Sequence, residues 1–285
     1  MISEELKDYL NHRTDGYFEF KQDLSGLKVN SCVNKYYLPN NKVYYVKSID
    51  EYVESYPMVS AEVLLSRLYP KLGIDSVKYY PLVNNKGKLG VISKDIFGIN
   101  ISDGREFFRE VMFKSAGTND VFVDQTTLYF SDKVNRGKLG TINNFLKYAD
   151  EDCFKQLFLL RGLDLATANC DRNPDNFFVE RDFDGVAKKL IALDYECSGS
   201  IDYNSDYYYS EFGKRMSCKN VIQAFKDNED YQQYITRFEI AEKIATAPFD
   251  ETAQEIKDEI GFVIEPEYLE RMKITSDKIA EELAK

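Results

Sequence analysis

The sequence predicts an α+β fold of two lobes, a small antiparallel β-rich lobe in residues 1–97 and a larger, mostly helical lobe in residues 98–285. Before residue 97, apolar side chains recur at every second position in short runs separated by turn residues, as in β-hairpins. After about residue 105, they recur with the period of a helix. Gly98, Asp103 and Gly104 lie where one pattern gives way to the other. We therefore expect a hinge in residues 95–104 and a functional site between the lobes.

The residue composition excludes several functional classes. The chain has 285 residues, of which 44% are hydrophobic, so it can bury a large core. Its single histidine, His12, is far in sequence from the acidic residues discussed below, which argues against histidine-based triads and metalloprotease motifs. The five cysteines are scattered without C-x-x-C spacing, so we expect neither a disulfide framework nor a zinc site. Carboxylates are left to carry the chemistry.

The charge and the hydropathy pattern restrict location and partners. The formal net charge is −11, whereas contact with phosphate backbones or anionic lipids depends on clustered lysine and arginine. Direct nucleic-acid binding is therefore not expected. The sequence has no apolar run of about 18 residues, and its first eight residues are too charged for a signal peptide. We expect a cytoplasmic protein without a membrane segment.

The first hairpin is expected in residues 31–38 and 42–49, around a turn at 39–41. In its second strand, Lys47 shares one face with Val43, Tyr45 and Ile49, because side chains alternate along a strand. A lysine among apolar neighbours needs an anion. The alternative is an edge-strand lysine that discourages aggregation.

A helix is expected next, beginning at Pro57 and ending at Tyr69, before Pro70. Glu62 lies beside its apolar stripe, so we expect this carboxylate to be half-buried and to pair with Lys47. A strand lysine followed by a helix glutamate is the pair that holds the nucleotide phosphates in kinases. The alternative is an ordinary solvated helix carboxylate.

Two further features complete the small lobe. Ser25 and Gly26 precede the first hairpin, where a loop covering phosphates would lie, although a Ser-Gly pair is also common in ordinary turns. Residues 77–83 and 88–93 are expected to form a second hairpin around a turn at 84–87. The result is a small antiparallel sheet with one helix.

The large lobe is expected to be mainly helical. Helices are expected at 141–149 and 154–168, within a region interrupted at 117–137. Helical periodicity returns at 219–247, 251–260 and 267–284, and we expect these segments to pack beneath the site. Residues 195–209 have few periodic apolar positions, which fits either a mobile segment beside the site or an ordinary surface loop.

The loop at 169–176 and the hairpin after it carry the expected chemistry. Strands at 177–179 and 190–193, folded about residue 185, would place Asn176 across from Asp194, with Asp171 in the loop leading in. Mg²⁺ prefers carboxylate and amide oxygens, and Asn176 and Asp194 offer them. Asp171, away from the metal, would orient an attacking hydroxyl and accept its proton. Turn residues alone would fit a structural loop, but the returning Asp194 favours a phosphoryl-transfer site that uses ATP and Mg²⁺.

Arg172 and Cys170 lie beside Asp171 in this loop. Arg172 is a candidate catalytic residue that would neutralise phosphate charge, and an ion pair with a nearby carboxylate is an equal alternative. Nothing in the sequence indicates a lowered pKa for Cys170, so we interpret it as a small buried residue.

At these positions the sequence resembles the HipA-like kinases, a bacterial branch of the protein-kinase-like fold. The resemblance rests on the N-x-D-R-x-x-x-N pattern of residues 169–176 and on the strand ending at Asp194, with weaker support from Lys47, the helix around Glu62 and the Ser25-Gly26 pair. It covers most of the chain from about residue 20. It implies a serine/threonine kinase in which Asp171 is the base, Asn176 and Asp194 hold Mg²⁺, and Lys47 contacts the phosphates of ATP. The chain departs from the family pattern at Asn173, where histidine is usual, and has few glycines in the phosphate loop.

Three functions remain open at this point. The leading interpretation is a kinase acting on a protein hydroxyl, with a protein substrate and a cognate regulator as partners. The second is a lipid or small-molecule kinase, because such enzymes also place Asp and Asn five residues apart. The third is an inactive nucleotide-binding or partner-binding module.

Overall fold

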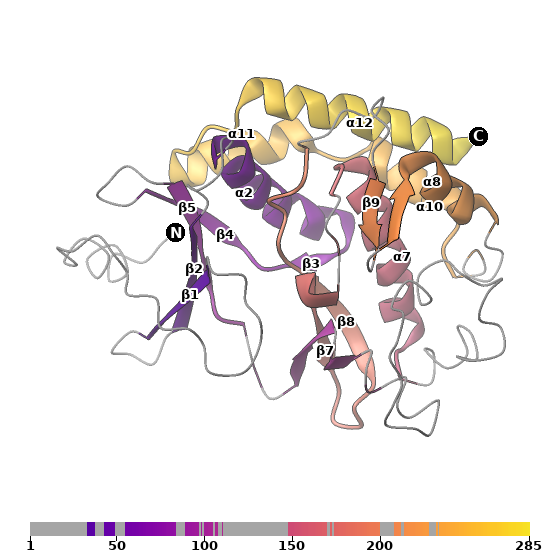
Figure 1. The fold of residues 1–285 in the computed structure, drawn as a ribbon, viewed down its shortest axis with the longest axis horizontal. Coiled ribbons are helices and arrows are strands. Elements are labelled where there is room, and N and C mark those ends of the chain that lie inside the picture. Colours follow the sequence, from indigo (N-terminus) through magenta and orange to yellow (C-terminus); the bar gives the residue numbers. More distant parts are fainter. Residues whose placement is uncertain are drawn as a thin grey trace.

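The computed structural model describes residues 33–37, 43–48, 55–83, 89–96, 98, 100–104, 106–107, 110, 148–169, 172, 174–199, 208–211, 214–227, 232 and 234–285. Its first sheet contains β1 (Val33–Tyr37), β2 (Val43–Ser48), β5 (Leu89–Lys94) and β4 (Tyr79–Val83), in that order. All three pairings are antiparallel, and both expected hairpins are present. Figure 1 shows this sheet on the left of the view.

Helix α2 (Ser55–Leu72) packs against β4 and β5 through a buried apolar stripe. The expected end at Tyr69 is wrong, because the helix continues through Pro70. A proline in the last turn lacks one backbone N–H and so removes one helical hydrogen bond. Two backbone hydrogen bonds just after it close the end of the helix. Gly73 adopts a φ of 100°, a conformation that favours glycine. Its N–H donates to the carbonyl of Pro70, and the N–H of Ile74 donates to the carbonyl of Tyr69. Glycine, rather than proline, therefore terminates α2.

The second sheet contains β3 (Asp75–Ser76), β8 (Ala187–Ala192), β7 (Phe177–Arg181) and β6 (Ile101–Asp103), in that order. The β7–β8 hairpin agrees with the expected one. Strand β3 is parallel to β8, and β6 is antiparallel to β7. Residues 101–103 of the expected hinge are thus a strand, and strands from both sides of residue 97 meet in one sheet. The fold combines sheets that are antiparallel except at β3 with helices, in agreement with the predicted α+β class. The boundary at residue 97 and the division into two lobes stay predictions.

The remaining described elements are mostly helices, with one short hairpin. They are α7 (Glu151–Ala166), the 3₁₀ helix η1 (Pro174–Asn176), β9 (Tyr208–Glu211), β10 (Lys214–Ser217), α8 (Cys218–Asp227), α10 (Arg237–Ala245), α11 (Phe249–Ile260) and α12 (Pro266–Ala284). Helix α7 begins three residues before the expected start because the Asp150 carboxylate caps it by accepting the N–H of Cys153. The expected helix at 141–149 is wrong at its end, where Ala149 forms a bridge to Ala187, and residues 141–147 lie outside the described part.

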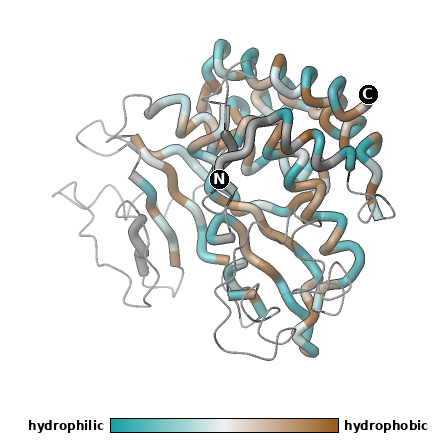
Figure 2. The backbone as a smooth tube through the Cα atoms, turned by 45° about the vertical axis from the view of Figure 1, so that its right-hand side comes forward, coloured by the Kyte–Doolittle hydropathy of each residue, from teal (hydrophilic) through white to brown (hydrophobic). Residues whose placement is uncertain are grey.

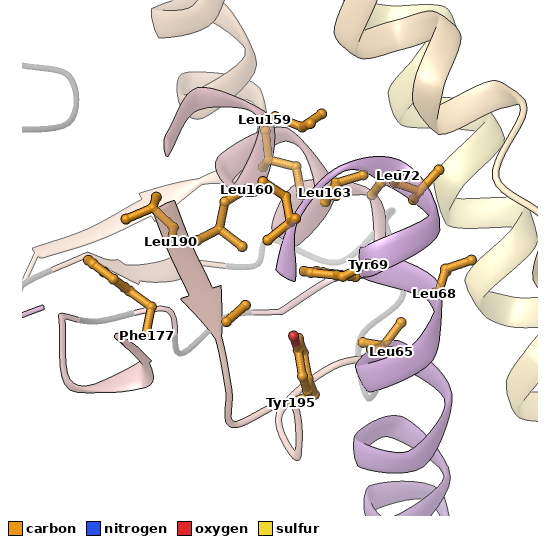
Figure 3. Packing of buried hydrophobic residues seen from close by; sticks show 14 of the residues in the cluster. Leu65, Leu68, Tyr69, Leu72, Leu159, Leu160, Leu163, Phe177, Leu190 and Tyr195 are labelled. Atoms are coloured by element: carbon orange, nitrogen blue, oxygen red, sulfur yellow. The ribbon is translucent and has the colours of Figure 1, made fainter. Parts of the chain in front are cut away.

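The core lies where α2, α7 and the β7–β8 hairpin meet, and Figure 3 shows their side chains directed toward one another. Tyr69, Phe177 and Tyr195 are among its largest fully buried side chains. Helix α10 approaches α7 so closely that a Cβ on Gly162 would lie 2.4 Å from Ile240 Cγ2. Along α12, which ends at the C-terminus, hydrophilic and hydrophobic residues alternate in Figure 2, as expected for a helix with one buried side.

Candidate functional site

Lys47 is the centre of a cluster of carboxylates. Its Nζ donates to Glu62 Oε1 at 2.9 Å and to Asp194 Oδ1 at 2.7 Å, and it lies 3.0 Å from Glu196 Oε2. Burial lowers the pKa of Lys47, but these three carboxylates outweigh that effect and raise the pKa well above its ordinary value. Lys47 therefore remains an ammonium group, and its expected pairing with Glu62 is present together with a contact to Asp194.

Glu62 fixes the geometry of the cluster from α2. Its side chain is 0% exposed, so the expectation of half-burial is wrong: residues 59–66 of α2 are all buried, which means that this part of the helix is covered on every side. Oε1 accepts from Lys47, and Oε2 accepts the backbone N–H of Tyr195 at 2.9 Å. Burial raises the pKa of Glu62 to about 7, and Lys47 opposes this shift. Both carboxylate oxygens thus hold a defined partner.

Asn176 and Asp194 lie together at the open end of the β7–β8 hairpin, but one residue out of the expected register. Phe177 pairs with Ala192, and the N–H of Leu193 donates to the carbonyl of Asn176 at 3.2 Å. Leu193, rather than Asp194, therefore lies across from Asn176. The difference arises at the turn, which is centred on residue 184 rather than 185, because the N–H of Asp182 donates to the carbonyl of Val186 and Arg181 pairs with Ala187. An irregularity between Glu180 and Arg181 then shifts the pairing by one residue toward the expected register.

Asp194 leaves the strand with a φ of 61°, a left-handed conformation that is uncommon outside glycine. The backbone thus turns sharply between Leu193 and Tyr195, and the Asp194 carboxylate contacts Lys47. Such strain persists only where the surroundings hold it in place. Here Glu62 holds the next peptide group by accepting the N–H of Tyr195.

Arg172 is committed to a buried structural contact. Its Nε and Nη2 donate to the two carboxylate oxygens of Asp164 at 3.0 and 3.1 Å, and its Nη1 donates to the carbonyls of Asn176 and Leu193. Its side chain is 1% exposed. Of the two roles considered from the sequence, ion pairing with a nearby carboxylate describes this geometry, and the catalytic role does not fit it. Arg172 instead ties the end of the hairpin to α7.

Asp164 was not identified from the sequence. It lies on α7 and accepts hydrogen bonds from Arg172, from the Tyr69 hydroxyl at 3.1 Å and from the Asn169 side chain at 3.2 Å. A carboxylate inside an apolar helix was the available signal, because such a residue needs partners when it is buried. Asp171, Ser25 and Gly26 lie outside the described residues, so the structure does not place the expected base or the expected phosphate loop.

The segment after Asp194 is anchored, contrary to the expectation of a mobile segment or an ordinary surface loop at 195–199. The Tyr195 hydroxyl lies 2.7 Å from Ser76 Oγ, and the Tyr268 hydroxyl donates to the carbonyl of Ser198 at 3.0 Å. The N–H of Gly199 donates to the carbonyl of Thr167 at 2.9 Å. These bonds tie the segment to β3, α12 and the end of α7. Residues 200–207 of the same stretch lie outside the described part.

The turn requires glycine at position 199. Gly199 has a φ of 69°, and a Cβ there would lie 2.6 Å from Tyr268 Cε2. A side chain would therefore be strained in its backbone and would also collide with the tyrosine ring. The close approach allows α12 to support the segment that carries Asp194.

Glu196 was also missed as a site residue. It lies two positions after Asp194, and this spacing of two acids was the signal available in the sequence. Glu62, Asp194 and Glu196 each offer a carboxylate oxygen, and these oxygens all lie within 4.8 Å of one another. Oxygen donors of this kind suit Mg²⁺, which takes one or two carboxylates together with water or phosphate oxygens. Asp194, one of the two expected metal ligands, thus lies among oxygen donors of the kind that Mg²⁺ takes, although both oxygens of Glu62 already have partners.

Comparison with known proteins establishes the fold. No family model and no curated protein sequence matches the chain. Its structure is similar to that of HipA from Shewanella oneidensis MR-1, solved with HipB and operator DNA, with a TM-score of 0.53, 11% identity, and coverage of 98% of this chain and 70% of that one. It also matches the Helicobacter pylori proinflammatory kinase CtkA, with a TM-score of 0.44, 14% identity, and coverage of 90% and 94%. The chain has a HipA-like fold, as the motif resemblance implied. None of the described helices combines the length and apolar character that crossing a membrane requires.

Proposed function

We propose that this chain is a kinase that uses ATP and Mg²⁺ to phosphorylate a serine or threonine hydroxyl of a protein. The observation that carries the proposal is the contact of Lys47 with both Glu62 and Asp194 on a HipA-like fold. A strand lysine paired with a helix glutamate, beside an aspartate that follows a strand, is the arrangement that kinases use to hold nucleotide phosphates and metal.

Each residue has a distinct role in this proposal. Lys47 binds the phosphates, and Glu62 orients Lys47 from its buried position on α2. Asn176 and Asp194 hold Mg²⁺, which neutralises charge on the transferred phosphate when it is bound. Asp171 orients the acceptor hydroxyl and accepts its proton. Ser25 and Gly26 cover the phosphates.

Arg172 has a positioning role in the same proposal. It binds the carbonyl of Asn176 and the carbonyl of Leu193, the residue before Asp194. One guanidinium group thereby holds the backbone next to both metal-binding side chains. Asp164 pairs with this guanidinium, so its positive charge is balanced in the protein interior.

The partners follow from the same comparison. The HipA structure contains HipB and operator DNA, and we propose a cognate protein regulator for this chain as well. The net charge of −11 disfavours direct nucleic-acid binding by the chain itself. A cytoplasmic location agrees with a substrate and a regulator of this kind.

Labelling with γ-³²P-ATP, Mg²⁺ and a cell lysate tests the proposal. We expect label on protein bands, with phosphoserine or phosphothreonine after acid hydrolysis, and no label with Asp194→Asn. Label confined to lipids or small solutes would indicate the second class of kinase. Nucleotide binding without any turnover would indicate an inactive module, and absence of nucleotide binding would contradict every form of the proposal.

A further inference from the structure

The ammonium group of Lys47 has one carboxylate oxygen for each of its three hydrogens. It has three hydrogens, and carboxylate oxygens of Glu62, Asp194 and Glu196 lie 2.9, 2.7 and 3.0 Å from its nitrogen. The side chain is 12% exposed, which leaves little room for a further partner. A phosphate can therefore bind Lys47 only if one of these carboxylates moves away.

Glu62 is poorly suited to move. It is completely buried, and its second oxygen accepts the N–H of Tyr195. Releasing Lys47 would leave a buried carboxylate without its cation, which is a large cost. Departure of Glu62 would also remove the support of the strained backbone at Asp194.

Asp194 and Glu196 are each about one-quarter exposed, at 27% and 22%, so either can exchange Lys47 for water or another ligand. Asp194 already has a role beside the nucleotide in the proposed function, where it would hold the metal together with Asn176. Glu196 is not one of the two residues to which the proposed function assigns the metal. It lies beyond the end of β8, in a turn rather than in a helix or strand, so its side chain can rotate away without disturbing a regular element.

We propose that Glu196 occupies the position of a nucleotide phosphate on Lys47 and is displaced when the nucleotide binds. This inference rests on the proposed function, because it assigns a competitor to the phosphate-binding lysine. Glu196 then sets the affinity for the nucleotide. The apparent affinity for the nucleotide equals the intrinsic affinity multiplied by the fraction of molecules in which Lys47 is available. Removing the competitor raises that fraction.

Calorimetric titration with ADP tests this role without turnover, once with Mg²⁺ and once with EDTA. We expect Glu196→Gln to bind ADP about fivefold more tightly than the wild type under both conditions, which corresponds to about 1 kcal/mol for an ion pair of this exposure. Glu196→Asp keeps the charge but shortens the side chain, and we expect it to bind more tightly as well. Glu242→Gln removes one charge from the exposed face of α10 and serves as the matched control, with unchanged affinity.

A double variant identifies Lys47 as the target of the competition. In a Lys47→Met background, Glu196→Gln should leave ADP affinity unchanged, because no ammonium group remains to compete for. Unfolding midpoints measured without ADP show whether each variant is folded.

Three outcomes would overturn the inference. Unchanged affinity in a folded Glu196→Gln, with ADP binding in the wild type, would remove the competitor role and leave the proposed function standing. Weaker binding only in the presence of Mg²⁺ would make Glu196 a metal ligand instead. Absence of ADP binding to the folded wild type would overturn the proposed function together with this inference.

Discussion

Two charged clusters, one around Asp164 and Arg172 and the other around Lys47, differ in their balance of charge and in their burial. In the first, Asp164 and Arg172 are almost completely buried and their charges balance. In the second, one lysine faces three carboxylates, and two of these are partly exposed. The balanced cluster is complete as it stands, whereas the unbalanced one has an excess of negative charge that a cation would relieve. The difference separates a structural contact from a binding site.

The largest expected effect tests the binding site. Asp171→Asn should lower turnover by roughly 10²- to 10⁴-fold, because a positioned general base is lost. It should leave nucleotide affinity nearly intact, since the proposed base does not touch the metal. Thermal melting with and without Mg²⁺-ATP measures the affinity: ligand at about 100 times its Kd stabilises by about 2.7 kcal/mol. That is a shift of several degrees at about 2–4 °C per kcal/mol.

Asp194→Asn provides the contrast within the same site. It should abolish most of the Mg²⁺-ATP shift as well as turnover, because a proposed metal ligand is lost. Without nucleotide, its unfolding midpoint should equal or exceed that of the wild type, since the change removes one of three carboxylates crowded around one lysine. An equal loss of the shift in Asp171→Asn and Asp194→Asn would show that the two roles are wrongly assigned.

The balanced cluster should respond in the opposite way. Asp164→Ala leaves the guanidinium of Arg172 buried without its carboxylate, which should lower the free energy of unfolding by about 3–5 kcal/mol. Urea denaturation measures this loss. Tyr69→Phe removes a neutral hydroxyl that donates to Asp164 and lies 3.0 Å from Thr167 Oγ1, and it should cost about 1 kcal/mol. A stability loss in Asp164→Ala as small as that of Asp194→Asn would remove the distinction between the clusters.

A smaller expected effect is the difference in alkylation rate between a cysteine on α7 and a cysteine beside Glu196. Cys153 is buried on α7, and burial raises the pKa of its thiol to about 12, whereas Cys197 is partly exposed beside Glu196. Because the thiolate is the reactive form, Cys153 should resist alkylation at pH 8 and react only above about pH 11 or after unfolding. Peptide mapping by mass spectrometry measures both thiols. Alkylation of native Cys153 at pH 8 as fast as that of Cys197 would show that α7 is not closed to solvent.

The sequence predicted those features that depend on local periodicity. The hairpins of the first sheet, the helix carrying Glu62 and the long helix before residue 169 all follow from spacing of apolar residues and turn signals. The inward direction of Lys47 follows from strand alternation alone. These predictions needed no information about distant parts of the chain.

The features that the sequence did not predict depend on long-range packing. Strand β3 is only two residues long and exists because β8 lies beside it. The register at Asn176 depends on an irregularity that apolar periodicity does not reveal. Full burial of Glu62 and the pairing of Arg172 with Asp164 depend on contacts between α2, α7 and the hairpin, which local patterns cannot specify.

The long sequence separation of the residues in the Lys47 cluster also limits how much of the site can fold during translation. Lys47 and Asp194 are 147 residues apart, and Glu62 and the backbone of Tyr195 are 133 apart. At ribosomal speeds of about 5–20 residues per second, Glu62 emerges roughly 7–30 s before its backbone partner. Throughout that interval the nascent chain holds a carboxylate destined for the interior without the group that satisfies it. The Lys47 cluster can therefore assemble only after Asp194 and Tyr195 have emerged, well after the first sheet and α2.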